Sequence, residues 1–329
     1  MDRTQPPATP TVSVVVPAFR TAHTLKAAID SILAQTLQDF EILLVEDHSG
    51  DDTLPVAQAL AAADPRITLL ALARNGGQAH ALNHGIAHAR GRWIATLDAD
   101  DVYHPNRLAS LVACGEREGV DMVADNQSHV DATAGVVVRT AFPPGDGGRL
   151  LTLRDFIDNN STQSSFSLGI LKPMIRSSFI AAHGLGYRDG LTLGQDFYHL
   201  MQFFAAGGRG WLTDRPTYVW TLPFGPVSRT WTTTGLGAWR YDYSGTIEAN
   251  RHFIKLMEQA GQPELVALLR RRESEYHTMQ HYIAAQKTLA ETGSLARAAR
   301  IIATHPSTWS LLARRVAGRV ARRLTPAAG

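Results

Sequence analysis

Two kinds of apolar stretch alternate through the first hundred residues of the chain. Short runs rich in Val, Ile and Leu indicate buried strands, and longer stretches with apolar residues every three or four positions indicate amphipathic helices. The strands are expected at 11–16, 40–45, 67–72 and 93–97, and the helices at 23–35, 52–63 and 78–89. Pro17 is expected to end the first strand. Strands that alternate with helices of this length predict parallel βαβ units and an α/β fold.

A polar segment follows each of the four predicted strands. These segments are Pro17–Arg20, Glu46–Ser49, Arg74–Gly77 and Asp98–Asp101. In a parallel sheet the carboxyl ends of the strands lie along one edge, and ligands bind there. The pattern therefore predicts a ligand site to which all four segments contribute.

The residue types at this edge exclude two common classes of nucleotide-binding protein. The turn after the first strand lacks the Gly-x-Gly-x-x-Gly of dinucleotide-binding folds, and the chain has no Walker-type Gly-x4-Gly-Lys-Ser/Thr. The edge is acidic instead, with Asp47, Asp98, Asp100 and Asp101. Crowded carboxylates repel one another unless a cation neutralises them, and carboxylate oxygens favour Mg²⁺ or Mn²⁺. Because Mg²⁺ in such sites is often shared with substrate phosphates, a nucleotide diphosphate is the predicted ligand.

Composition is that of an ordinary globular protein in a reducing compartment. The chain has 329 residues, 44% of them hydrophobic, which suits one large domain with an extension or two smaller domains. Cys114 is the only cysteine, and no apolar run reaches the roughly 20 residues that cross a bilayer. The polar residues 1–10 contain no secretory signal. We expect a cytoplasmic protein that does not span a membrane.

Charge is distributed unevenly along the chain. Residues 292–329 contain seven arginines and no acidic residue, so this segment carries +7 and the remainder −5, for a net charge of +2. Within it, 309–324 form a candidate amphipathic helix with Trp309 at its start. Such a helix is typical of a peripheral contact with the inner face of the cell membrane, and equally of an exposed helix or a dimer contact. Nucleic acid is not expected as a partner, because no nucleic-acid motif accompanies the arginines.

Three motifs, taken together and in order, resemble the signatures of the family 2 glycosyltransferases, which have the GT-A fold. They are Val12–Phe19, Glu46–Thr53 and Asp98–Asp101. The resemblance is close over about residues 11–125 and looser to about 230. It implies a Rossmann-like, mostly parallel sheet flanked by helices. The expected divisions are a disordered N-terminus (1–10), a GT-A domain (11–235, nucleotide-binding half 11–125 and acceptor half 126–235), a helical extension (236–295) and a basic amphipathic tail (296–329).

The resemblance assigns roles to the matching positions. Pro17, Ala18, Phe19 and Asp47 would line the nucleobase pocket. Asp98 would lie near the ribose and the metal, and Asp100 would be the direct ligand of Mn²⁺ or Mg²⁺, which would neutralise the leaving diphosphate. The full nucleotide-sugar site is expected to include Arg20, Ser49, Asn75, Gly77 and Ala99 as well. Arg20 stands where the family more often has Asn, so its contact with the nucleobase is left open.

Asp196 is the candidate catalytic base. The family usually has a Glu-Asp pair at the start of a helix, and here Gln195-Asp196 stands at that place. The resemblance implies that Asp196 deprotonates the acceptor hydroxyl on the face opposite the diphosphate, which gives inversion. Replacement of Glu by Gln195 removes a neighbouring charge and is expected to lower the pKa of Asp196. The alternative is that Asp196 is only a first-turn acid favoured by the helix dipole.

The middle of the chain resembles a narrower group. Leu168–Pro173, Ile175-Arg176 and Tyr187–Asp189 are similar to bacterial glucosyltransferases that build succinoglycan-type exopolysaccharides on a polyprenyl diphosphate carrier. Lys172, Ser228 and Arg229 are candidates for phosphate or acceptor contacts. The segment 225–231 is predicted to be a lid over the donor or a plain surface loop.

Simpler interpretations accompany these hypotheses. Asp98–Asp101 could only cap a helix that begins near Pro105, and His80, His84 and His88 share a helix face that is more often solvated than metal-binding. Residues 141–148 are expected to form a loop or hinge, and 246–290 to be helical with a break at 261–263.

The sequence therefore predicts an inverting, metal-dependent hexosyltransferase. It would move a sugar from a UDP-sugar to a saccharide or a lipid-linked saccharide in exopolysaccharide or other cell-surface glycan synthesis. The alternative is a nucleotide-sugar-binding scaffold without catalysis, which the off-pattern residues Arg20 and Gln195 suggest. A sugar nucleotidyltransferase is remote, because the first turn lacks a Gly-rich loop.

Overall fold

The protein folds into two compact units, residues 1–232 and 233–329, in the computed structural model described below. The structure describes residues 9–143, 145, 147–159, 167–191, 193–222 and 242–309. Expectations for residues 1–8, Ser228, Arg229 and 310–329, which hold most of the basic tail, lie outside this range.

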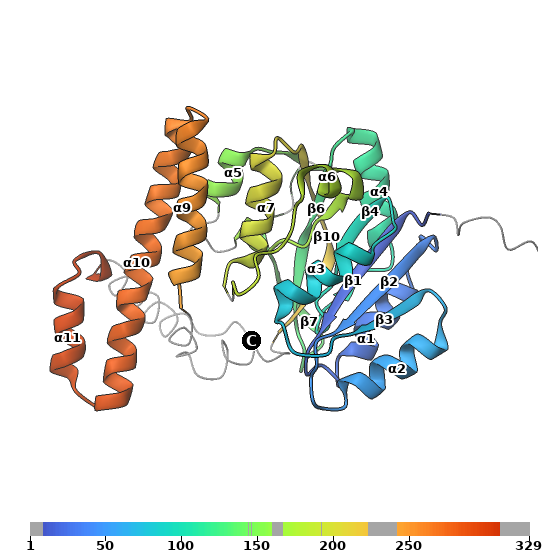
Figure 1. Ribbon diagram of the computed structural model, residues 1–329, viewed down its shortest axis with the longest axis horizontal. Coiled ribbons are helices and arrows are strands. Elements are labelled where there is room, and N and C mark those ends of the chain that lie inside the picture. The colour runs from blue at the N-terminus through green and yellow to red at the C-terminus, as the bar shows by residue number, and fades with distance from the viewer. Residues whose placement is uncertain are drawn as a thin grey trace, which may run out of the picture. The chain divides into compact units, whose positions relative to one another are not determined.

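The first unit is built around a ten-stranded mixed sheet in the order β3-β2-β1-β4-β9-β6-β10-β5, with β7 beside β6 and β8 beside β10 (Figure 1). Its strands are β1 (Val12–Ala18), β2 (Phe40–Glu46), β3 (Ile67–Ala71), β4 (Trp93–Thr96), β5 (Val102–Tyr103), β6 (Met122–Asp131), β7 (Val136–Thr140), β8 (Arg149–Leu151), β9 (Met174–Arg176) and β10 (Gly210–Leu222). Its helices are α1 (Leu25–Leu33), α2 (Thr53–Ala63), α3 (Gln78–His88), α4 (Arg107–Glu118), α5 (Leu153–Asp158), the short 3-10 helix η1 (Leu168–Ile170), α6 (Ser177–His183) and α7 (Gln195–Ala205). The α/β fold is therefore as predicted.

The parallel part of the sheet is β3-β2-β1-β4, together with the β6–β10 pair. Every residue of β1 and β2 is buried, which explains their unbroken apolar sequences. Alternate residues of β1 point to opposite faces. Val12, Val14 and Val16 pack in the core that includes α1 and α4, whereas Val15 faces Gly85 of α3. Helices therefore cover both faces of the parallel strands.

The first strand does not end at Pro17, contrary to the prediction. Pro17 and Ala18 pair with Val45 and Glu46 of β2. The last pair between β1 and β4 is Val15 with Thr96, and the Val15 oxygen accepts from the Leu97 N–H on that side. Pro17 faces the same side beyond this pair, so its missing N–H removes no ladder hydrogen bond.

The region after β4 also differs from one of the simpler interpretations. The short strand β5 comes directly after Asp101, and α4 begins only at Arg107, with Asn106 as its N-cap. The aspartates of 98–101 therefore cap no helix at this point. The described part of 141–148 connects β7 to β8, outside any helix or strand, as expected.

The second unit is helical in its described part, with α9 (Ser244–Gln259), α10 (Pro263–Thr292) and α11 (Leu295–Ala303). The predicted break lies at 261–263, where α10 begins with Pro263 in its first turn. The side chain of Asn250 donates to the Leu269 oxygen at 2.9 Å and so ties α9 to α10. No helix in the described residues is long and apolar enough to span a membrane.

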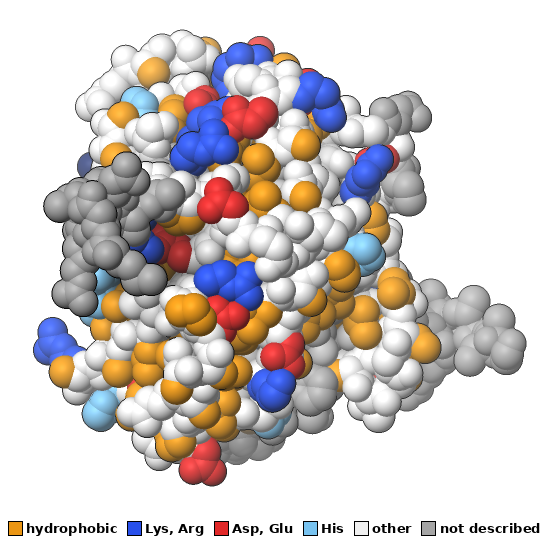
Figure 2. Space-filling view, turned by 90° about the vertical axis from the view of Figure 1, so that its right-hand side faces the viewer, with side chains coloured by type: hydrophobic (Ala, Val, Ile, Leu, Met, Phe, Trp, Pro, Cys, Tyr) orange, Lys and Arg blue, Asp and Glu red, His pale blue; other side chains and the backbone are white. Residues whose placement is uncertain are grey.

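On the face of the molecule seen in Figure 2, basic and acidic side chains lie next to one another rather than in separate fields. This face therefore has no large area of a single charge sign.

Candidate functional site

Three aspartates gather at the carboxyl end of β4. Oxygen atoms of Asp98, Asp100 and Asp101 lie within 4.8 Å of one another. The Asp101 carboxylate is buried and already bound, because it accepts from the Tyr218 hydroxyl at 2.7 Å and from the Thr221 N–H at 2.9 Å. Asp98 and Asp100 are half-buried. These two side chains are the members of the cluster that a ligand could share.

Burial and mutual repulsion together govern the electrostatics of this cluster. Burial, with the charge of Asp98, raises the pKa of Asp100 to about 7 from its ordinary value of 3.8. A cation bound to these oxygens would relieve the repulsion and favour the ionised form of Asp100. The donor set contains oxygen only, which fits Mg²⁺ or Mn²⁺ better than a soft metal. The residues present therefore fit the ion that the sequence predicted, with Asp98 and Asp100 as its ligands.

Asp98 is held in place by side chains from two other segments. Gln78, the first residue of α3, donates from Nε2 to Asp98 Oδ1 at 2.9 Å. Lys172, which follows η1, places its Nζ 3.0 Å from Asp98 Oδ2. Gln195 in turn donates to the Gln78 side-chain oxygen. Since a Glu at 195 could not donate this hydrogen bond when ionised, the departure from the family pattern has a local structural role.

Asp196 lies on the other side of the same lysine. It is the second residue of α7, and its Oδ2 is 3.1 Å from Lys172 Nζ. Burial raises the pKa of Asp196 above its ordinary value, and the Lys172 charge opposes this shift. The main effect on the pKa of Asp196 is therefore burial, and not the lowering expected from Gln195. Asp98 and Asp196 are 98 residues apart in sequence. Their Oδ2 atoms lie at most about 6 Å apart, because both contact the same lysine Nζ, at 3.0 and 3.1 Å.

The cavity behind Asp196 is too small for a sugar. Its volume is about 10 Å³, and its walls are mostly apolar side chains such as Ile94, Ile175 and Leu200, with Asp196 and His199. Such a volume is close to that of one water molecule. An acceptor would therefore have to reach Asp196 from outside this cavity.

At the other end of the site, Asp47 organises the loop after β3. Its buried carboxylate accepts from the Gly76 and Gly77 N–H groups, both at 2.8 Å, and from the Asn75 side chain at 3.0 Å. Charge-assisted hydrogen bonds of this kind are strong. Asp47, Asn75 and Gly77 are thus brought together as predicted, and in this structure they bind one another.

The turn after β1 is fastened to the turn after β2. The Arg20 main-chain N–H donates to Ser49 Oγ at 3.1 Å, and Arg20 Nε donates to the main-chain oxygen of Ser49 at 3.4 Å. Arg20 has a φ of 54°, the left-handed region that favours glycine. Three other predicted residues, Pro17, Ala18 and Ala99, are buried. Phe19 and Arg20 are the members of this group whose side chains a ligand could reach.

The comparison with known families agrees with this geometry. The sequence profile described as glycosyl transferase family 2 matches residues 13–172, which include β1–β4, the acidic cluster and Lys172. Residues 13–172 belong to this family.

Similarity to individual proteins extends over a longer stretch than residues 13–172. The succinoglycan biosynthesis protein ExoO of Rhizobium meliloti is 36% identical over 223 residues, which cover 67% of this chain and 63% of ExoO. A second relative, the succinoglycan biosynthesis protein ExoU of the same organism, is 33% identical, and the match covers 58% of ExoU. The chain therefore spans less than two thirds of the length of either relative.

Solved structures of low sequence identity share the fold. TarS of S. aureus in complex with UDP-GlcNAc gives a TM-score of 0.65 at 17% identity, covering 85% of this chain and 81% of TarS. The mannosyltransferase PcManGT of Pyrobaculum calidifontis, in complex with GDP-Man and Mn²⁺, gives 0.52 at 21% identity, covering 91% and 80%. The predicted GT-A fold is confirmed.

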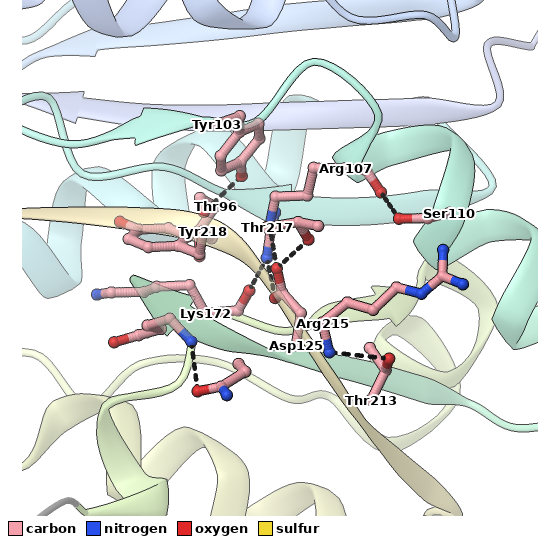
Figure 3. Close-up of polar contacts among 12 residues, drawn as sticks. Thr96, Tyr103, Arg107, Ser110, Asp125, Lys172, Thr213, Arg215, Thr217 and Tyr218 are labelled. Carbon is pink, nitrogen blue, oxygen red and sulfur yellow. Dashed lines mark hydrogen bonds and ion pairs between the residues drawn. The ribbon is translucent and has the colours of Figure 1, made fainter. Parts of the chain in front are cut away.

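A buried ion pair between Arg107 and Asp125 contacts the segment that carries Lys172. Arg107 of α4 is fully buried, and its guanidinium makes two hydrogen bonds to Asp125 of β6, at 2.8 and 2.9 Å. The same guanidinium donates to the main-chain oxygen of Lys172 at 2.6 Å (Figure 3). Thr217 donates to Asp125 at 2.6 Å from β10. This pair therefore fixes the segment that carries Lys172.

The histidine stripe of α3 is separate from the acidic cluster. The rings of His84 and His88 are tilted by 39° with centroids 4.6 Å apart, and His88 Nδ1 bonds to the main-chain oxygen of His84 at 2.8 Å. Across the described residues, the aspartate cluster after β4 is the one group with metal-binding geometry, so the histidine stripe holds no such site. Lys172, the candidate for a phosphate or acceptor contact, lies at the site, where its amine contacts the carboxylates of Asp98 and Asp196. Ser228, Arg229 and the segment 225–231 lie outside the described residues.

Several residues of the site were not predicted from the sequence. Gln78, Tyr218 and Arg107 hold Asp98, Asp101 and the Lys172 segment respectively. Gln78 could have been found, because it follows Gly77 at the edge where the strands end. Tyr218 and Arg107 carry no such signal, since their partners are 117 and 65 residues away.

Proposed function

We propose that this protein is an inverting, metal-dependent hexosyltransferase. It transfers a sugar from a UDP-sugar to a saccharide or a polyprenyl-diphosphate-linked saccharide in exopolysaccharide or other cell-surface glycan synthesis. The proposal rests chiefly on one observation. Asp98, at the predicted metal and ribose end, and Asp196, the candidate base, share the amine of Lys172. The carboxylate that would activate the acceptor, Asp196, and the one that would help hold the donor, Asp98, thus lie in the same site.

The transfer step uses residues from both halves of the fold. Asp196 accepts the proton of the acceptor hydroxyl as that oxygen forms a bond to the anomeric carbon. The bond from the same carbon to the diphosphate breaks on the opposite face, so the configuration inverts and UDP leaves. A divalent ion held by Asp98 and Asp100 would neutralise the leaving diphosphate. The turns at Phe19–Arg20 and Asp47–Ser49 would position the nucleoside.

The relatives support the class of substrate. ExoO is by name a succinoglycan biosynthesis protein, and the two solved structures contain nucleotide sugars, one of them with Mn²⁺. The scaffold alternative loses part of its motivation, because Gln195 has a place in the hydrogen-bond chain to Asp98. We place the enzyme in the cytoplasm, where its basic segment after residue 292 would contact the inner face of the cell membrane that carries the lipid-linked acceptor.

A donor panel with membrane-extracted acceptor lipids tests the proposal. The full chain with Mn²⁺ should release UDP and extend the acceptor. Asp100→Ala should lower turnover at least ~100-fold through loss of the ion, and Asp196→Asn should lower it by about 10²–10⁴-fold through loss of the base. Asp30→Ala, which removes an exposed carboxylate paired only with Lys26, should leave turnover unchanged.

Three results would count against the proposal. Full turnover in EDTA would exclude the metal, and full turnover by Asp196→Asn would exclude that base. UDP-sugar binding without transfer to any acceptor in the panel would favour the scaffold instead.

A further inference from the structure

Lys172 is an unusual lysine because its amine is enclosed by acidic groups. Its side chain is 8% exposed, and its Nζ lies almost equally far from Asp98 Oδ2, at 3.0 Å, and from Asp196 Oδ2, at 3.1 Å. Lysine is rarely buried to this extent unless it is paired. With two carboxylates as partners, the amine remains charged in this position.

The lysine is anchored independently of these two carboxylates. Its main-chain oxygen accepts from Arg107, which is held by Asp125, and none of these three groups belongs to the acidic cluster (Figure 3). Leu171 and Pro173 on either side are buried as well. The backbone of Lys172 is therefore fixed, while its four-carbon side chain lets the amine shift between partners.

The charges around this amine do not balance. Asp98, Asp100 and Asp196 bring three carboxyl groups, and Lys172 is the one basic side chain within ion-pair distance of Asp98 or Asp196 among the described residues. With all three carboxylates ionised, a divalent ion bound to Asp98 and Asp100 would neutralise the remaining negative charge, and the ion and the amine would share Asp98. Cation and amine therefore compete for the same carboxylate.

We propose that Lys172 is the counter-ion of the acidic site, a positioning residue that the divalent ion displaces from Asp98. Before the donor binds, Lys172 holds Asp98 and Asp196 together. When the ion binds, the amine keeps Asp196 in place and gives up Asp98. The inference rests on the proposed function only for the presence of the ion. It differs from the phosphate contact expected from the sequence, because it assigns the amine to carboxylates.

Removing the charge of Lys172 distinguishes the counter-ion role from a phosphate contact. Loss of a competing cation leaves an extra negative charge at the metal site, so Lys172→Met should bind Mn²⁺ alone about tenfold more tightly. Lys172→Gln, which keeps a hydrogen-bond donor but not the charge, should show the same tightening. Damage to the structure would weaken binding, so the direction separates a counter-ion from a structural residue.

Free Mn²⁺ measured by electron paramagnetic resonance gives these affinities on the full chain, without donor sugar or acceptor. Lys26→Met is the matched control, since Lys26 is exposed, forms its ion pair with Asp30 in the same helix and loses the same charge; this variant should bind Mn²⁺ like the wild type. Thermal unfolding checks that each variant is folded. The two substitutions differ in polarity, so a folding failure of one still leaves the other to decide.

Unchanged or weaker Mn²⁺ binding by a folded Lys172 variant would overturn the counter-ion role. A loss of UDP affinity in the presence of Mn²⁺ would instead favour the phosphate contact. Absence of Mn²⁺ binding by the wild type would contradict the metal itself and this inference with it. Tightened Mn²⁺ binding in a protein that transfers no sugar would leave the counter-ion role intact and remove only the proposed reaction.

Discussion

Gln195, at the place where the family usually has Glu, connects α7 to the acidic cluster. The departure from Glu is visible in the sequence, but the main influences on the pKa of Asp196, which are burial and the charge of Lys172, are not. The amide donates to Gln78, which donates to Asp98, and this chain crosses three segments of the sequence. Asp47, Asp98, Asp100 and Asp196 could be selected in advance because each stands at a strand end or a helix start. Their hydrogen-bond partners could not.

His199 provides a residue-scale prediction about pH. It is buried on α7, stacked on Tyr187 with centroids 4.4 Å apart, and burial lowers its pKa to about 4 from 6.5. Between these values the unfolded chain binds a proton that the folded chain does not. Stability is therefore complete above pH 6.5 and falls as the pH drops towards 4, by about 3 kcal/mol for this group. Urea unfolding at several pH values measures the slope.

His199→Asn should reduce that slope, whereas His252→Asn, at an exposed position on α9, should not. His129, whose pKa burial also lowers to about 4, remains in every protein compared. Identical pH dependence of wild type and His199→Asn would contradict the assignment.

At the scale of elements, the sequence predicted what local pattern determines. The fully buried β1 and β2 are marked by unbroken β-branched and aliphatic runs, and α1 and α3 by their apolar spacing. The short strands β5, β8 and β9 were not predicted. Each has two or three residues, and it pairs with a distant part of the chain, so nothing within it marks a strand. These strands complete the half of the sheet that carries Lys172 and Tyr218.

The Arg107–Asp125 pair is where α4 and β6 depend on each other. Both side chains are at most 1% exposed. Arg107→Met would leave Asp125 buried without its cation, which should cost about 3–5 kcal/mol in the free energy of unfolding. The double variant Arg107→Met/Asp125→Leu removes both charges and should recover part of that loss. Urea unfolding of the single and double variants measures the difference. A double variant as unstable as the single one would show that the pair's charges are not the cause.

At the scale of the whole molecule, the candidate site lies in the first unit. The family match, the acidic cluster and the candidate base all fall within residues 13–196. The topology argument could place the strand ends along one edge because parallel βαβ units leave little choice. It could not place Asp196, whose approach to Asp98 follows from the packing of β9, η1 and α7 around the Lys172 segment.

The central claim is that a divalent ion and a nucleotide diphosphate bind together where β4 ends. Anomalous X-ray diffraction from crystals of the full chain grown with Mn²⁺ and UDP measures this directly. The account predicts an anomalous peak within about 2.5 Å of an Asp100 carboxylate oxygen, with the UDP diphosphate on its other side. A peak elsewhere in the molecule, or UDP bound at this edge with no ion beside Asp98 and Asp100, would contradict it.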